Sequence, residues 1–152
     1  MDSHWAPARL RSMPSWLINQ TSVRAHRLVS EKLSTVDAHR YHYSTLAALD
    51  ELGAMSQAEL GRRCGLDRSD VAAVVAELAD RKFVRRVTDA DDRRRNIVSI
   101  TASGRRRLTT LEGLLRDTQK QLLAPLSAGE REQLVRLLLR VVEDAAADRP
   151  QS

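Results

Sequence analysis

The sequence predicts a mainly α-helical fold that carries one small β-hairpin. Apolar residues recur at helical spacing over most of the chain, in segments that begin at capping residues and end at glycine or proline. Between residues 56 and 82, two short capped helices are joined by a turn at Gly65. Two β-prone runs, 83–87 and 97–100, then flank a loop of acids and arginines. This order is typical of a winged helix-turn-helix with additional helices at both ends.

The composition suits one small domain with extensions. The chain has 152 residues, of which 42% are hydrophobic and 30% charged, and no apolar run approaches membrane-spanning length. The N-terminus lacks the apolar core of a signal peptide. The single cysteine, Cys64, fits a reducing compartment. We therefore expect a cytoplasmic protein with no membrane partner.

The N-terminal third is expected to form a tail and two helices. Residues 1–12 resemble a flexible tail, and residues 14–36 an amphipathic helix with Pro14 in its first turn. Asp37 is expected to cap the next helix, which Gly53 ends.

The winged helix-turn-helix is expected to span residues 37–101, with its wing at about 83–100. Ser56 and Glu59 have the spacing of a capping box, which opens the first helix of the pair. Asp67 is placed to cap the second helix.

Residues 102–144 are expected to form two further helices, followed by a tail at 145–152. Thr101 can cap the first of them, Pro125 breaks it, and a capping box at Ser127 opens the last.

The terminal helices are longer and more apolar than a small DNA-binding domain requires. They can pack on their own domain only, or they can form a homodimer. We favour the homodimer, because a two-fold axis places two recognition helices roughly 34 Å apart, about one turn of DNA.

The charge distribution indicates a polyanionic partner. The chain has a net charge of +5, and eight arginines lie between Arg85 and Arg107, within and just after the predicted wing. Only five residues are aromatic, and four of these precede residue 44. The basic region therefore lacks a platform for stacking unpaired bases, which favours double-stranded DNA.

The second helix of the pair is expected to enter the major groove. One face is an apolar stripe, and the other presents Arg68 to grip a guanine and Ser69 to donate to a base or phosphate. Ala72 and Ala73 let the backbone approach and can contact thymine methyl groups. Asp70 can accept a hydrogen bond from cytosine or take part in the helix cap with Asp67, and we favour the cap. The alternative, an ordinary amphipathic surface helix, is weakened by the flanking elements.

The wing loop is expected to contact the minor groove. In isolation such a charged run is a solvated turn, but here two strands bracket it, and arginines at a hairpin tip can enter a narrow groove. Asp92 can hold one arginine extended. The start of the first short helix is expected to lie over a phosphate. The contacts expected from these two segments are Ser56, Gln57, Asp92, Arg93, Arg94 and Arg95.

The run from Gly61 to Leu108 resembles the core of the MarR family of transcriptional regulators. The marker is the pattern D-x-x-D-R-R starting at Asp89, followed by a strand, Thr101 and Gly104. The similarity extends over nearly the whole chain from about residue 14. It implies a homodimeric winged helix that usually represses genes near its own and is released by a small ligand.

The resemblance also implies roles for single residues. Arg94 would enter the minor groove with Asp92 orienting it, and residues 68–73 would lie in the major groove. Many relatives carry polar residues where Ala72 and Ala73 stand, so base readout is expected to depend on Arg68 and Ser69.

In such proteins effectors occupy a cleft between the dimer helices and the DNA-binding lobe. Here the bordering helices hold nearly all the aromatic and imidazole side chains, which would suit a flat anionic aromatic compound. Packing alone is the alternative for Trp16 and Tyr43. The candidate ligand-binding residues are Trp16, His26, His39, His42 and Tyr43.

No cofactor, metal or enzymatic activity is expected. His39 and His42 have the spacing of half a zinc site, but nothing nearby in the sequence completes it, so solvated histidines are favoured. Cys64, at the end of an amphipathic helix, is expected to pack rather than to act as a redox switch. The sequence contains no glycine-rich phosphate loop and no nucleophile–base constellation.

These features favour a homodimeric, ligand-responsive transcription regulator, a repressor, that binds a pseudo-palindromic double-stranded operator. Two alternatives remain open. The first is a winged-helix module for protein–protein interaction, in which the arginines face an acidic partner. The second is a DNA-binding protein that is indifferent to sequence.

Overall fold

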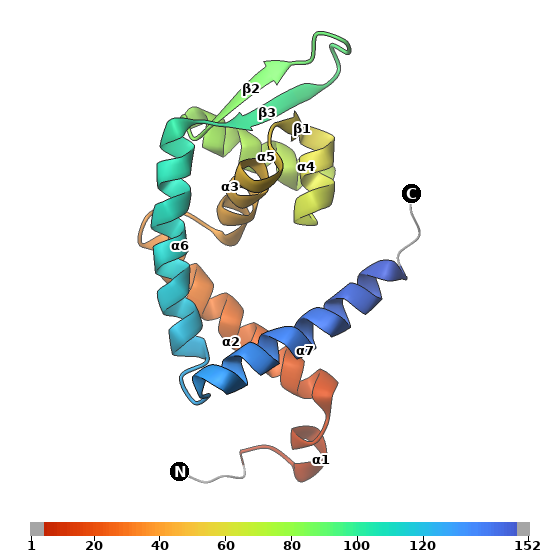
Figure 1. Cartoon of the computed structure of the whole chain (residues 1–152), viewed down its shortest axis with the longest axis vertical. Helices are drawn as coiled ribbons and strands as arrows, with labels where there is room; N and C mark the ends of the chain where they lie inside the picture. Colours follow the sequence, from red (N-terminus) through yellow and green to blue (C-terminus); the bar gives the residue numbers. More distant parts are fainter. Residues whose placement is uncertain (1–4, 149–152) are drawn as a thin grey trace. The chain divides into compact units, whose positions relative to one another are not determined.

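The computed structural model describes residues 5–148 and divides the chain into two compact units, Met1–Thr118 and Gln119–Ser152. Its elements are drawn in Figure 1. In chain order they are α1 (Ala8–Arg11), α2 (Pro14–Ser34), α3 (Arg40–Leu52), β1 (Met55–Ser56), α4 (Gln57–Cys64), α5 (Arg68–Asp80), β2 (Val84–Thr88), β3 (Asn96–Ile100), α6 (Ala102–Leu122) and α7 (Ala128–Ala147).

The prediction of a mainly helical fold with a small wing is confirmed. Strands β2 and β3 pair antiparallel from Val84 opposite Ile100 to Thr88 opposite Asn96. The short strand β1 pairs with the other edge of β3, which gives a sheet of order β1-β3-β2. This third strand was not predicted, because two residues are too few to show a period of two.

The core of the first unit lies where its helices meet the sheet. Leu46 of α3 and Leu60 of α4 are completely buried, as is Val98 at the centre of β3. Burial of such side chains stabilises by about 1.5–3 kcal/mol each. The same cluster includes Leu33, Leu49, Val71, Val74, Val75, Leu78, Val84, Leu108 and Leu111.

The start of α6 is fixed against the end of α5 and the wing. Thr101 accepts a hydrogen bond from the backbone N–H of Gly104 at 2.9 Å, as a capping residue does, and its hydroxyl donates to the carbonyl of Lys82 at 2.7 Å. A Cβ on Gly104 would lie 2.0 Å from the carbonyl oxygen of Phe83. Only glycine therefore allows this close approach of α6.

Asp37 does not cap α3, contrary to prediction. The helix starts at Arg40 with His39 in the N-cap position, and no side chain caps it. Asp37 has a left-handed φ of 53°, and its carbonyl oxygen accepts a hydrogen bond from Arg81 at 2.6 Å. It therefore turns the chain between α2 and α3.

The N-terminal tail expected at 1–12 differs in the structure. Residues 1–4 lie outside the described residues, but α1 occupies part of the remainder. The indole rings of Trp5 and Trp16 lie 5.3 Å apart, which places the segment before α1 against the start of α2.

The second unit is dominated by α7, which begins at a complete capping box formed by Ser127 and Glu130. The helix extends to Ala147 and so includes part of the tail expected at 145–152, whereas residues 149–152 lie outside the described range. None of the residues of α7 is buried. Its exposed large apolar residues are Val135, Leu137, Leu138, Leu139, Val141 and Val142. From residue 5 to residue 148, no helix has both the length and the apolar character needed to span a bilayer.

Candidate nucleic-acid interface

Helices α4 and α5 form the helix-turn-helix around two glycines. Gly65 ends α4 with a left-handed φ of 66°, and the N–H of Leu66 returns to the carbonyl of Gly61 at 2.9 Å. A Cβ on Gly61 would lie 3.3 Å from Cγ1 of Val71. The absence of a side chain at Gly61 therefore lets α5 pack closely against α4.

The first turn of α5 is organised by Asp67. Its Oδ1 accepts the backbone N–H of Asp70 at 2.8 Å and the hydroxyl of Ser69 at 2.9 Å. These bonds hold the pKa of Asp67 below its usual value, and the bond from Asp70 has the larger effect. The backbone N–H of Asp70 takes part in the cap, and the Ser69 hydroxyl donates within the protein. Arg68 is exposed at the same end of the helix.

The capping box predicted at the start of α4 is only half formed. The Ser56 hydroxyl accepts the N–H of Glu59 at 3.2 Å. The carboxylate of Glu59 instead bonds to Arg62 and, at 2.9 Å, to Nε of Arg63. Hydrogen bonds from these two arginines lower the pKa of Glu59. The carboxylate therefore compensates part of the positive charge on this helix.

The wing loop is closed by its aspartates. The N–H of Asp89 donates to the carbonyl of Arg95 at 2.8 Å, and its carboxylate lies 3.8 Å from Nε of Arg95. Asp92 accepts the backbone N–H of Arg94 at 3.0 Å. Asp92 thus orients the main chain at Arg94. The sequence had instead suggested that Asp92 holds an arginine side chain. Arg93, Arg94 and Arg95 are all exposed.

A hollow of about 520 Å³ lies between the helix pair and the wing. It brings together five of the predicted DNA contacts, namely Ser56, Gln57, Arg68, Arg94 and Arg95. The predicted contacts Ser69, Asp70, Ala72, Ala73, Asp92 and Arg93 do not line it. Ala73 is exposed on α5, and Ala72 is half-buried.

Six residues that line this hollow were not among the predicted contacts: Ala58, Gly61, Arg62, Leu66, Val71 and Asn96. Ala58 and Arg62 are four residues apart on α4, so they share one face of the helix. That spacing could have indicated from the sequence that Arg62 lies on the face of α4 that borders the hollow. Asn96 begins β3, and nothing in the sequence indicated that its side chain faces the helix pair.

A second hollow, of about 630 Å³, lies against α2 and the start of α3. Its lining includes two of the five candidate ligand residues, His26 and His39. Arg40 also lines it, with Nη1 2.9 Å from Nε2 of His26 and Nη2 donating to the hydroxyl of Tyr41 at 2.7 Å.

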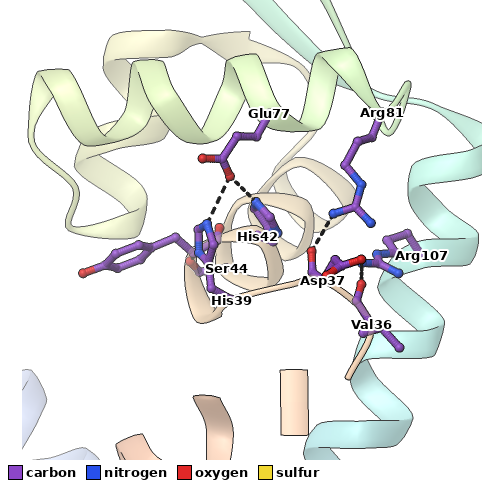
Figure 2. A network of polar contacts seen from close by, with 9 residues as sticks. Val36, Asp37, His39, His42, Ser44, Glu77, Arg81 and Arg107 are labelled. Atoms are coloured by element: carbon purple, nitrogen blue, oxygen red, sulfur yellow. Dashed lines mark hydrogen bonds and ion pairs between the residues drawn. The ribbon is translucent and has the colours of Figure 1, made fainter. Parts of the chain in front are cut away.

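The other three candidate ligand residues lie elsewhere. Trp16 stacks with Trp5, and Tyr43 packs half-buried against the core. Burial raises the pKa of Tyr43. His42 is buried and lies 2.7 Å from the carboxylate of Glu77 on α5 (Figure 2).

The fold, the tight turn and the arginine-bearing wing together define a winged helix-turn-helix protein. The model of the MarR family matches residues 37–95. A probable transcriptional regulator from Pseudomonas aeruginosa is 32% identical and superimposes with a TM-score of 0.77, over 88% of this chain and 99% of that one. The chain belongs to the MarR family of transcriptional regulators. Membership in this family agrees with the expectation that the protein is not an enzyme.

Two named relatives are also similar. The PcaV transcriptional regulator of Streptomyces coelicolor, solved in complex with its natural ligand, is 30% identical with a TM-score of 0.76, over 92% of this chain and 99% of that one. The transcriptional repressor NicR of Pseudomonas putida is 33% identical over 101 residues. That match covers 66% of this chain and 64% of the length of NicR.

Proposed function

We propose that the chain is a homodimeric transcriptional repressor that binds a pseudo-palindromic DNA operator and is released by a small ligand. A regulator of this kind acts in the cytoplasm, where its operator lies. The observation that carries the proposal is the hollow between α4, α5 and the wing. It places Arg68, at the start of the helix expected in the major groove, in one lining with Arg94 and Arg95.

Exposed apolar residues support the dimer. On α2, Leu17, Ile18 and Val23 are exposed, and α7 carries a longer run of exposed Leu and Val side chains. Several large apolar side chains exposed on one helix are typical of a protein–protein interface. A two-fold dimer would present two copies of α5 to successive major grooves.

The relatives and the second hollow support a repressor that responds to a ligand. NicR is a repressor, and PcaV has a natural ligand. In this chain His26, Arg40 and Tyr41 supply imidazole, guanidinium and phenol groups to the hollow against α2. Such groups around a partly apolar wall suit a small anionic aromatic compound.

The decisive experiment compares Arg94→Ala with Arg24→Ala in titrations of DNA from upstream of the chain's own gene. Arg24 is an exposed arginine of α2, so the two variants lose the same charge. Arg94→Ala is expected to weaken binding and to reduce the slope of log K against log salt by about one for each copy engaged. Arg24→Ala is expected to leave both the affinity and the salt slope nearly unchanged.

Three outcomes would overturn the proposal. Equal behaviour of the two variants would remove the wing from the interface. Absence of a complex resistant to competitor DNA would favour a protein-binding module. Equal affinity for the upstream fragment and for bulk DNA at matched salt would indicate a sequence-indifferent binder.

Ligand response is tested by adding aromatic carboxylates to the preformed complex. We expect at least one of them to release the DNA from the wild-type chain and to do so less effectively with Arg40→Ala. If every compound that releases the DNA acts equally on both proteins, the effector does not occupy this hollow.

A further inference from the structure

Three potential metal ligands converge between α3 and α5 (Figure 2). His39 is the N-cap residue of α3, His42 lies in its first turn, and Glu77 extends from α5. The Oε2 atom of Glu77 lies 3.2 Å from Nε2 of His39 and 2.7 Å from Nε2 of His42. The two imidazole rings are tilted by 33° to each other, with centroids 3.8 Å apart. Both histidines therefore present the same ring nitrogen to one carboxylate.

These separations are close to those of a coordination sphere. Ligand atoms that bind a tetrahedral zinc ion at about 2.0–2.2 Å lie about 3.3–3.6 Å from one another. The three ligand atoms here all lie within 4.8 Å of one another. The pair formed by His42 and Glu77 has to open by several tenths of an ångström to admit an ion. The carboxylate can make this movement because 51% of its side chain is exposed.

Access and charge are also suitable for a cation. The side chain of His39 is 44% exposed, so a hydrated ion can reach the cluster from solvent, whereas that of His42 is 5% exposed. The guanidinium group of Arg81, at the end of the helix that carries Glu77, is engaged elsewhere, because it donates to the carbonyl of Asp37 (Figure 2). Two neutral imidazoles and one carboxylate form a donor set of two nitrogens and one oxygen, which matches zinc with water in the remaining position.

We propose that His39, His42 and Glu77 form a binding site for one divalent transition-metal ion of the zinc type. The ion would join the start of α3 to the helix that carries Arg68. Metal binding at these three side chains does not require DNA binding, because their geometry alone provides the site.

The surroundings of His42 indicate the strength of binding. Its other ring nitrogen, Nδ1, is buried and has no hydrogen-bond partner among the described residues. Zinc ligands usually donate this second N–H to an acceptor, and loss of such a partner lowers metal affinity by about 10- to 100-fold. We therefore expect a Kd in the micromolar range, weaker than that of a dedicated structural zinc site.

The test is titration of the full, untagged chain with Zn²⁺ by calorimetry and with Co²⁺ by absorption spectroscopy. The variants are His39→Gln and Glu77→Gln, with His26→Gln as the matched control, because His26 is an exposed histidine outside the cluster. We expect one ion per protomer and the intense visible bands of tetrahedral Co²⁺. Each cluster variant should lower the affinity at least 10-fold, and the control should leave it unchanged.

Glu77→Gln also replaces the charged partner of a buried histidine by a neutral amide and can lower stability. His39→Gln keeps the test decisive, because His39 is half exposed and is not part of the core. Absence of a saturable Zn²⁺ site in the wild-type chain would overturn the proposal. Retention of binding in a folded His39→Gln protein, or its loss in His26→Gln, would do the same. None of these results depends on whether the protein binds an operator.

Discussion

Asp92 holds the backbone of Arg94 rather than its guanidinium group: Oδ1 of Asp92 accepts the N–H of Arg94 at 3.0 Å. The N–H of Arg95 donates to the carbonyl of Asp92 at 3.0 Å, so the side chain and the backbone carbonyl of Asp92 both accept hydrogen bonds within the turn. The acid therefore sets the conformation of the loop from which the exposed arginines project.

This relationship predicts that Asp92 can be replaced by an isosteric acceptor but not by alanine. Asp92→Asn keeps the side-chain oxygen, whereas Asp92→Ala removes a hydrogen bond of about 1 kcal/mol and loosens the turn. We expect Asp92→Ala to weaken operator binding by about 5-fold and Asp92→Asn to change it much less, in anisotropy titrations at fixed salt. If both variants lose affinity equally, the charge of Asp92 matters and the turn does not.

Gly104→Ala is expected to destabilise the protein strongly. The new Cβ would lie 2.0 Å from the Phe83 carbonyl oxygen, so α6 or the end of the wing has to move. We expect a loss of at least about 3 kcal/mol in chemical denaturation, at the upper end of overpacking effects. Gly113→Ala is the control in the same helix, because its Cβ would meet nothing within 4 Å. It should stabilise by up to about 1 kcal/mol, and a similar effect of the two changes would contradict this view of Gly104.

Cys64 is expected to react slowly with thiol reagents. Its Sγ donates to the carbonyl of Ser44 at 3.5 Å, and burial raises the pKa of the thiol. A raised pKa means that less thiolate is present at any pH below it, and the thiolate is the reactive form. Alkylation by iodoacetamide at about pH 7.5 should therefore be at least about 10-fold slower in the native than in the denatured chain. The alkylation rate of the native chain should continue to increase as the pH is raised well above neutral. Equal rates in the native and denatured chains would indicate a reactive, redox-capable thiol.

The proposed dimer predicts that a charge on the apolar part of α7 separates the protomers. Leu138 is exposed in the single chain, and Leu138→Glu would place a carboxylate in the interface without a partner. We expect light scattering to give a monomer for this variant at micromolar concentration and a dimer for the wild type. Gln133→Glu adds the same charge at an exposed polar position of α7 and should remain dimeric. A dimer in both variants would place the interface elsewhere.

Local signals in the sequence were reliable where no neighbour competes for the same groups. At Ser127, both halves of the capping box form, with the N–H of Ser127 donating to Glu130 at 2.9 Å. At Ser56, the same spacing gives only one half, because Arg62 and Arg63 hold the carboxylate of Glu59. In both cases the pattern correctly predicted where the helix starts. The partner of the glutamate side chain depends on whether the next turn of the helix carries arginines that compete for it.

Non-local contacts explain what the sequence did not reveal. His39 and His42 have the spacing of half a zinc site, but solvated histidines were favoured, because Glu77 follows His42 by 35 residues and faces it only when α3 and α5 pack together. Asp37 was misassigned for a related reason. Its left-handed backbone and its carbonyl bond to Arg81 depend on how α2, α3 and α5 meet. Cap preferences describe one helix at a time and contain no such information.

The stacking of Trp5 on Trp16 has a practical consequence for measuring stability. These are the only two indoles in the chain, and their rings lie 5.3 Å apart at the start of α2. Tryptophan fluorescence therefore reports on this one contact and carries no direct signal from the helix-turn-helix or the wing. An emission transition during heating or denaturation would record the release of the N-terminal segment, and it can precede loss of the hydrophobic core. Circular dichroism is needed to follow unfolding of the part that is proposed to hold DNA.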